Sequence, residues 1–202
     1  MLSLLLDSAN TMLGVGLAQD GKMIEEVSYE AWQRQSELMI PEIDKLFKKH
    51  NINPKDIGEI LVAKGPGSYT GVRIALTIAK IYAYCLNIPV YAFSSLNLLE
   101  NYEKTSICLI NAKGNRSYFG VYNQDKAIEE DKVLTNGDVL KYVEEHPDYV
   151  ICGDASYIDL LSERNSVLEN MLKLKSDMFK VDNILTLKAT YLKDENDYKI
   201  SK

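Results

Sequence analysis

The stretch AKGPGSYTGVRIA, from Ala63 to Ala75, constrains the fold of this chain more than any other. A short apolar run at 57–63, typical of a buried strand, leads directly into it, and a long helix is expected to follow as far as about Leu86. Glycines at such a turn allow positive φ angles and let one backbone approach another closely. The stretch therefore predicts a strand-to-helix turn within an α/β fold.

Two nucleotide-binding motifs fail on the spacing of these glycines. A P-loop needs a lysine directly after its last glycine, whereas Val72 follows Gly71. A dinucleotide fingerprint has the spacing Gly-x-Gly-x-x-Gly, which is one residue shorter than the spacing here. We interpret the stretch as a structural turn in which Ser68 or Thr70 caps the next helix, although its amides could still hold an anion weakly. This glycine loop comprises Gly65, Gly67, Ser68, Thr70 and Gly71.

A pattern of strands followed by a helix occurs twice along the chain. The first half has predicted strands at 2–6, 14–18, 23–29, 57–63 and 89–93, with helices at 35–50, at 70–86 and from 95 to about 102. The second half has predicted strands at 106–111, 117–122, 133–134 and 149–152, with helices ending at 145 and spanning 156–179. We therefore expect two α/β subdomains, 1–104 and 105–202.

Charge and composition argue against several classes of protein. The chain has 23 basic and 29 acidic residues, a net charge of -6, which is unfavourable for unaided nucleic-acid binding. Its cysteines are odd in number and far apart (Cys85, Cys108 and Cys152), which argues against a disulfide framework or a zinc site. No apolar run approaches the ~20 residues of a membrane span, and the N-terminus lacks the basic region of a signal peptide. We expect a cytoplasmic protein with no membrane partner.

The sequence shows no catalytic constellation. His50 and His146 each end a predicted helix, and neither has an acidic or cysteine partner nearby in the sequence. No nucleophile–base pair is therefore visible, although one could be assembled in space. Asp7, at the end of the first strand, could hold Mg²⁺ in a sugar-kinase-like fold, but a turn residue that bonds its own backbone is the more common case. We expect no catalytic residue and no metal.

The helix after the glycine loop is apolar around most of its circumference. Its polar residues form one narrow stripe, and the apolar arc is wider than packing on one sheet requires. The edges of that arc must be covered by neighbouring elements or by another subunit. One edge contains Ile74 and Ile81, and the other contains Leu76 and Ala83.

The glycine loop and the residues after it, Gly65 to Ile74, closely resemble the signature of the bacterial TsaB (YeaZ) family. The opening LLLDS, the hairpin from Ile110 to Tyr118 and the motif Tyr191-Leu192-Lys193 resemble other parts of the family pattern. The resemblance is weaker after about residue 125. Asn111 stands where the family usually has aspartate, and Ala189-Thr190 where a proline is common.

The resemblance implies two ribonuclease-H-like halves, as in the actin, Hsp70 and sugar-kinase (ASKHA) superfamily. It implies a non-catalytic scaffold for the paralogue TsaD, which transfers threonylcarbamoyl to N6 of an adenosine in tRNAs that read ANN codons. TsaD would bind directly to helices 35–50 and 70–86, the ATPase TsaE would join the complex, and tRNA would be contacted only indirectly. The expected partner-binding residues are Leu38, Glu42, Lys45, Lys49, Arg73, Ile74, Thr77, Lys80, Ile81 and Tyr84. The first four recur along helix 35–50 opposite its apolar face, so we expect them to form an exposed stripe.

The isolated chain is expected to need no cofactor, with a nucleotide only at the partner interface. The metal motif His-x-x-x-His of TsaD would fall near Gln35–Met39, which reads QSELM, so the older glycoprotease label has no chemistry here. Two other functions remain open. A stand-alone homodimeric binding protein would use the same helices on itself. A small-molecule kinase would need a second phosphate loop and an adenosine pocket, and the sequence shows neither.

Overall fold

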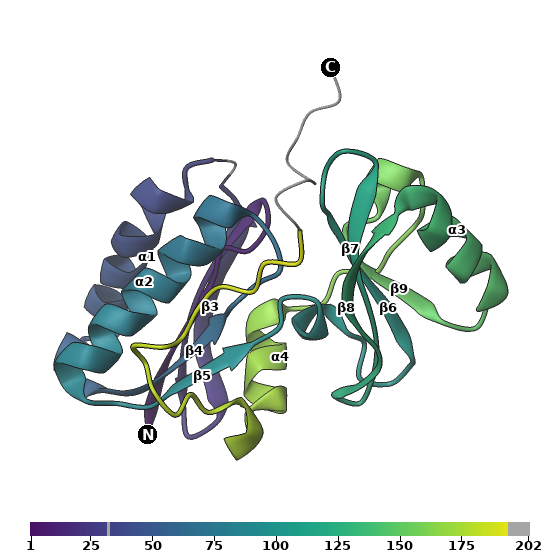
Figure 1. Ribbon diagram of the computed structural model, residues 1–202. Coiled ribbons are helices and arrows are strands. Elements are labelled where there is room, and N and C mark those ends of the chain that lie inside the picture. The colour runs from purple at the N-terminus through teal and green to yellow at the C-terminus, as the bar shows by residue number, and fades with distance from the viewer. Residues whose placement is uncertain (32, 194–202) are drawn as a thin grey trace.

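The computed structural model describes residues 1–31 and 33–193, which form two mixed sheets with helices (Figure 1). The first sheet has the strand order β3-β2-β1-β4-β5 and the second has the order β8-β7-β6-β9. The strands of the first sheet are β1 (Leu2–Asp7), β2 (Met12–Gln19), β3 (Lys22–Glu30), β4 (Ile57–Ala63) and β5 (Val90–Phe93). Those of the second are β6 (Ser106–Asn111), β7 (Arg116–Asn123), β8 (Lys126–Thr135) and β9 (Val150–Gly153).

Strand β1 is the centre of the first sheet because its leucines are buried on both faces. Leu4 pairs with Leu17 of the antiparallel β2 and with Ile60 of the parallel β4. All three side chains are fully buried. An uninterrupted apolar run of this kind is typical of a strand covered on both sides. In β3, by contrast, exposed and half-buried residues alternate, as expected of a strand at the edge of the sheet.

The second sheet repeats this arrangement. Strand β6 pairs antiparallel with β7 and parallel with β9, as β1 does with β2 and β4. Helix α3 (Asn136–Glu145) covers one face and contributes the buried Val139. The expectation of strands followed by a helix, repeated along the chain, is confirmed for these elements. The division between residues 104 and 105 stays a prediction.

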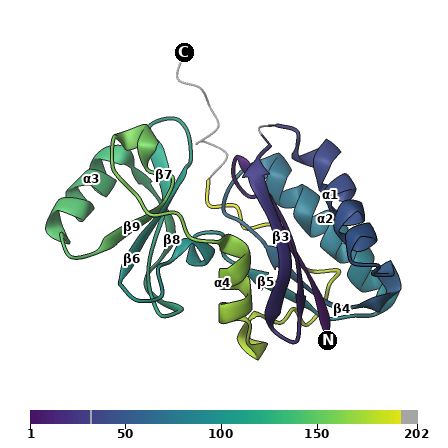
Figure 2. The same ribbon diagram turned by 180° about the vertical axis from the view of Figure 1, so that it is seen from behind.

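Three helices cover the first sheet from both sides. Helices α1 (Gln35–Lys49) and α2 (Tyr69–Leu86) lie side by side on one face, and α4 (Val167–Leu174) lies on the other (Figures 1 and 2). Leu168 of α4 reaches β2, where its side chain would come 3.2 Å from a Cβ on Gly16. This glycine therefore makes room for α4. Part of the C-terminal half of the chain thus packs on the first sheet.

The segment after α4 runs back along the first sheet, and we name residues 175–193 the C-terminal strap. Its backbone joins β5 where the amide of Val181 donates to the carbonyl oxygen of Val90 at 2.8 Å. Further on, the amide of Thr190 donates to the carbonyl oxygen of Lys64 at 2.7 Å. Leu187 is buried in the same apolar cluster as the sheet. In Figure 1 the strap, in yellow, passes beside α2 and ends between the two sheets.

Two predicted helical regions are shorter than expected. Residues 95–102 contain only the 3-10 turn η2 (Asn97–Leu99), and 156–179 contains η3 (Ser156–Ile158), α4 and η4 (Asp177–Phe179). The Ser94 hydroxyl accepts hydrogen bonds from the amides of Leu96 and Asn97 and so starts η2 as a cap would. The amide of Asn101 donates to the Ser106 hydroxyl instead of continuing a helix.

In the part of the chain that is described, no helix is both long and apolar enough to cross a membrane.

Candidate functional site

The glycine loop lies against the turn that follows β1. The amide of Ser68 donates to the carbonyl oxygen of Ala9 at 2.6 Å, and the Ser8 hydroxyl donates to the carbonyl oxygen of Gly71 at 2.7 Å. A Cβ on Gly67 would stand 2.0 Å from the Ala9 oxygen, and one on Gly71 would stand 2.0 Å from the Ser8 oxygen. Close backbone contact therefore requires glycine at both positions, whose φ angles lie outside the left-handed region.

Gly65 is needed for a different reason. Its φ angle is +95°, and a Cβ there would stand 2.9 Å from the carbonyl oxygen of Thr190 in the strap. Ser68 caps α2, since its hydroxyl accepts from the amide of Gly71 at 3.2 Å, whereas Thr70 is exposed in the first turn. The amides of Ser68 and Gly71 thus donate within the chain. Weak anion binding at the loop stays a prediction.

Asp7 is buried beside the glycine loop. Its Oδ1 accepts a hydrogen bond from the amide of Ala9 at 3.0 Å, and burial raises the pKa of this carboxyl to about 6. The interpretation of Asp7 as a turn residue is confirmed by that bond. Among residues 1–31 and 33–193, no three His, Cys, Asp or Glu side chains are grouped so that they could hold a metal ion.

Both histidines make contacts that anchor helix ends. His50 Nε2 lies 2.6 Å from Glu25 Oε2 on β3. The ring of His146 stacks on Tyr142 with centroids 4.1 Å apart and lies 4.8 Å from the ring of Tyr149. None of these neighbours is a serine or cysteine nucleophile. The contacts fasten the C-terminal ends of α1 and α3 to the structure around them.

The predicted stripe on α1 faces β3. Glu42 is only 8% exposed, and its Oε1 accepts from the Tyr29 hydroxyl at 3.1 Å and from Lys45 Nζ at 2.7 Å. Lys49 Nζ donates to Glu25 Oε1 at 2.6 Å. The expectation that Glu42 belongs to an exposed stripe opposite the core is therefore wrong. Helix α1 is rotated so that this edge meets the outer strand of the sheet.

The other edge of α1 faces α2. The ring of Phe47 meets the ring of Tyr82 edge-on, with centroids 6.5 Å apart. Asp44 precedes Phe47 by three residues and Ile40 precedes it by seven, so both share its side of the helix. Ile40 is 53% exposed, whereas Leu38 is half-buried on the Glu42 side. Ile40 was not among the partner-binding residues expected from the sequence. An isoleucine that lies outside the apolar face of this helix could have indicated an exposed contact residue.

Helix α2 presents apolar side chains to the outside. Tyr84 is 73% exposed and Ile81 is 57% exposed. We name Ile40, Ile81 and Tyr84 the outer face. The remaining predicted residues of α2 are either exposed (Arg73, Thr77) or half-buried (Ile74, Lys80).

The two edges of the apolar arc on α2 differ. Leu76 and Ala83 are buried in the apolar cluster that also contains Leu187 of the strap. Ile81 on the opposite edge is open, and Ile74 is only partly covered. The chain itself therefore covers the edge with Leu76 and Ala83. The edge with Ile81 stays exposed and forms part of the outer face.

At the N-terminal end of α2, Arg73 is held by an aromatic ring. Its Nη1 donates to the Tyr69 hydroxyl at 2.6 Å, and its guanidinium carbon lies 5.0 Å from the centre of the Tyr69 ring. That ring stacks on Tyr191 of the strap, with centroids 5.2 Å apart and planes inclined by 26°. Arg73 is thus braced by Tyr69 and, through it, by the strap.

A cleft of about 1040 Å³ lies between the two halves. The first half contributes Asp7 and the glycine loop, the second contributes Asn111 and Asp154, and the strap contributes Lys193. The glycine loop therefore opens onto a space that both halves line.

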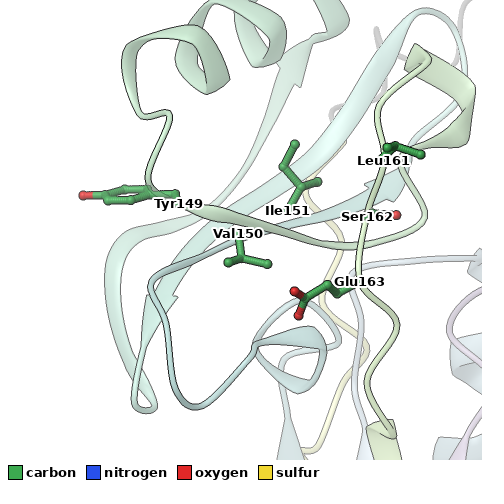
Figure 3. Close-up of a pocket in the computed structure, with 6 residues that line it drawn as sticks. All are labelled: Tyr149, Val150, Ile151, Leu161, Ser162 and Glu163. Atoms are coloured by element: carbon green, nitrogen blue, oxygen red, sulfur yellow. The ribbon is translucent and has the colours of Figure 1, made fainter.

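A smaller pocket of about 340 Å³ lies at the edge of the second sheet (Figure 3). It is formed by β9, through Val150 and Ile151, and by a segment that includes Leu161 and Glu163. Glu163 bonds to β9 through its backbone, with its amide 2.9 Å from the carbonyl oxygen of Ile151. Leu161 is 96% exposed. The pocket shares no residue with the cleft or with the outer face.

Comparison with known proteins relates the chain to tRNA-modification proteins. Residues 27–147 match the family model described as TsaD, tRNA N6-adenosine threonylcarbamoyltransferase. The chain is 34% identical over 137 residues to the tRNA threonylcarbamoyladenosine biosynthesis protein TsaB of Bacillus subtilis; the match covers 66% of this chain and 60% of that protein. It is 28% identical over 197 residues to the uncharacterized protein MG208 of Mycoplasma genitalium, covering 95% of this chain and 94% of that protein.

Among solved structures, YeaZ from Pseudomonas aeruginosa superposes with a TM-score of 0.74 and 23% sequence identity. The superposition covers 95% of this chain and 99% of YeaZ. At this level of identity the likeness concerns the fold. The predicted fold class, two ribonuclease-H-like α/β halves, is confirmed.

Proposed function

The chain belongs to the TsaB (YeaZ) family, and from this premise we propose that it is a non-catalytic scaffold that binds and activates TsaD during N6-threonylcarbamoyladenosine modification of tRNA. TsaD as the partner follows from the family resemblance, and the family model that matches residues 27–147 is described as that transferase.

The outer face is the observation that carries this proposal. Tyr84 and Ile81 present large apolar groups to solvent in the C-terminal half of α2, at 73% and 57% exposure. Aromatic anchors of this kind contribute most of the binding energy in protein interfaces. Ile81 on the open edge of α2 and Ile40 on the side of α1 that faces α2 add exposed apolar surface, which a helix pair from TsaD would cover.

Contacts elsewhere in the chain support a non-catalytic role. His50 is bonded to Glu25, and His146 lies between Tyr142 and Tyr149, so neither stands beside a nucleophile. The Asp7 carboxylate is bonded to its own turn. General acid–base or metal-assisted catalysis needs such groups directed at a substrate.

The finer features of the proposal follow from the family resemblance. The ATPase TsaE joins the complex, and tRNAs that read ANN codons are contacted through TsaD rather than by this chain alone. A net charge of -6 fits indirect contact with tRNA. A nucleotide, where one binds, lies at the partner interface, and the complex works in the cytoplasm.

Binding of purified TsaD from the same organism, measured by calorimetry, tests the proposal. We expect a complex with the wild-type chain, and threonylcarbamoyl transfer to tRNA only when both proteins, TsaE and the activated substrate are present. The double variant Ile81→Glu with Tyr84→Glu should lose the complex. Leu161→Glu is the matched control, because Leu161 is 96% exposed on the other half.

Two results would contradict the scaffold role. One is metal-dependent turnover by the purified chain alone, and the other is wild-type affinity for TsaD in a folded Ile81/Tyr84 double variant. Self-association through the same face is expected to compete with TsaD. Sedimentation at several protein concentrations, with and without TsaD, measures that competition.

A further inference from the structure

Two adjacent residues at the end of the strap hold opposite halves of the molecule. Tyr191 stacks on Tyr69 of α2, which belongs to the first half. Leu192 packs against the apolar cluster of the second half, which contains Ile110 and Tyr118. The two neighbouring side chains therefore contact different halves.

The strap is firmly attached to the first half up to this point. Its backbone is bonded to β5 through Val181 and to the glycine loop region through Thr190. Phe179 packs on Phe93 with ring centroids 4.9 Å apart. The position of Leu192 relative to the first half is therefore set by a chain that is itself held in place, and not by Tyr191 alone.

This contact adds to the two chain segments that join the halves, 94–105, which leads from β5 to β6, and 154–166, which leads from β9 to α4. The cleft lies between the halves, and Lys193, the residue after Leu192, lines it. Figure 1 shows the strap rising between the two sheets at this place.

We propose that Tyr191 and Leu192 form a clasp that fixes the opening of the cleft and, through Tyr69, holds Arg73 in place on the partner-binding side of α2. The clasp would couple the angle between the halves to partner binding. When the halves separate, Leu192 leaves the second half or Tyr191 leaves Tyr69. Loss of the Leu192 contact leaves Tyr191 less constrained against Tyr69, and loss of the Tyr191 contact removes the stack, so both weaken the aromatic support of Arg73.

The part of the proposal that concerns Arg73 rests on the proposed function, whereas the clasp itself does not. Arg73 donates to the Tyr69 hydroxyl at 2.6 Å and lies over its ring. A ring that is stacked on a second ring has fewer orientations, so an arginine attached to it is pre-organised. Pre-organisation raises affinity by reducing the entropy that binding would otherwise cost.

The clasp is tested on the isolated chain by electron-spin distance measurements. Spin labels at Lys48→Cys on α1 and Lys141→Cys on α3 report on the two halves, and both sites are exposed. Cys85 is exposed and is replaced by serine, whereas Cys108 and Cys152 are buried. We expect one narrow distance distribution in this background and in Tyr191→Phe, which keeps the ring. Tyr191→Ala and Leu192→Ala should each broaden it.

The same variants without labels are then titrated with TsaD. Tyr191→Ala and Leu192→Ala should bind about five- to tenfold more weakly, the effect of one aromatic pair, while Tyr191→Phe binds as the wild type does. Distances unchanged in both alanine variants would overturn the clasp. Broadened distances with unchanged affinity would overturn the coupling to Arg73. If the wild type fails to bind TsaD, the proposed function fails, and the distance measurements still decide the clasp.

Discussion

Glu42 of α1 and Tyr29 of β3 are joined by a hydrogen bond of 3.1 Å from the tyrosine hydroxyl to the carboxylate. Because Glu42 is buried at this contact, α1 is fixed to the sheet by the edge that the sequence pattern had indicated as exposed. The opposite edge, with Ile40, is thereby turned toward α2. We therefore expect a partner to bind near the junction of the two helices.

This orientation predicts a role for Ile40 in partner binding. Ile40→Glu should weaken TsaD binding at least about tenfold, because it places a charge in a desolvated apolar contact. Lys48→Ala, which changes an exposed residue on the same helix, should leave the affinity unchanged. Calorimetry on both variants, with thermal midpoints as a check on folding, measures this. Equal affinities for the two variants would place the interface elsewhere.

The backbone contacts of the glycine loop predict a loss of stability without any role for a ligand. Gly71→Ala and Gly67→Ala should each destabilise the fold by about 2 to 3 kcal/mol, since the added methyl group meets a carbonyl oxygen. Gly137→Ala is the matched control, because the nearest atom to a Cβ there is 3.8 Å away. It lies in α3, where alanine is favoured over glycine by up to about 1 kcal/mol. Urea denaturation gives all three values, and wild-type stability in Gly71→Ala would refute the packing argument.

The buried carboxyl of Asp7 predicts a pH dependence of folding. Its folded pKa of about 6 lies above its ordinary value of 3.8, so between these pH values the folded state binds more protons than the unfolded state. Stability should therefore fall as the pH rises through this window, by roughly 2 to 3 kcal/mol for this group. Asp7→Asn removes the titration and should gain stability relative to wild type between pH 4 and pH 7. A constant difference between the two proteins over that range would disprove it.

A buried ion pair predicts that the start of the strap is held electrostatically. Lys175 Nζ lies 2.5 Å from Glu59 Oε1, which also accepts from the Ser3 hydroxyl at 2.5 Å. Glu59 is 1% exposed, and its Oε2 has no hydrogen-bond partner among residues 1–31 and 33–193. Lys175→Met should cost about 3 kcal/mol because it leaves a buried charge unpaired. Adding Glu59→Gln should recover much of that loss. Chemical denaturation measures the free energy of unfolding of the single and double variants.

The sequence was most informative where structure depends on local backbone geometry. The strand before Gly65, a cap at Ser68 or Thr70 and the helix to Leu86 were all predicted, because a run of apolar residues, a hydroxyl and a few glycines suffice to specify them. The repeated order of strands and helices predicted an α/β fold, and the family resemblance implied its ribonuclease-H-like class. These features depend on neighbours that are close in the sequence.

The sequence was least informative where a contact joins distant segments. The rotation of α1 depends on Tyr29 and Glu25, which lie on a strand before the helix, and no periodicity within the helix reveals them. The stack of Tyr191 on Tyr69 joins residues that are far apart in the chain. Residues 95–102 were predicted to be helical, yet they form only one turn, because the chain there crosses between two sheets.

The packing of α4 on the first sheet has a consequence for synthesis of the protein on the ribosome. The strands and helices from β1 to β5 emerge first, yet the face of β2 that Leu168 covers remains bare until α4 has been translated. During that interval the nascent chain exposes apolar sheet surface, a state prone to aggregation. The first half can therefore finish folding only after α4, which comes late in the sequence, has been translated.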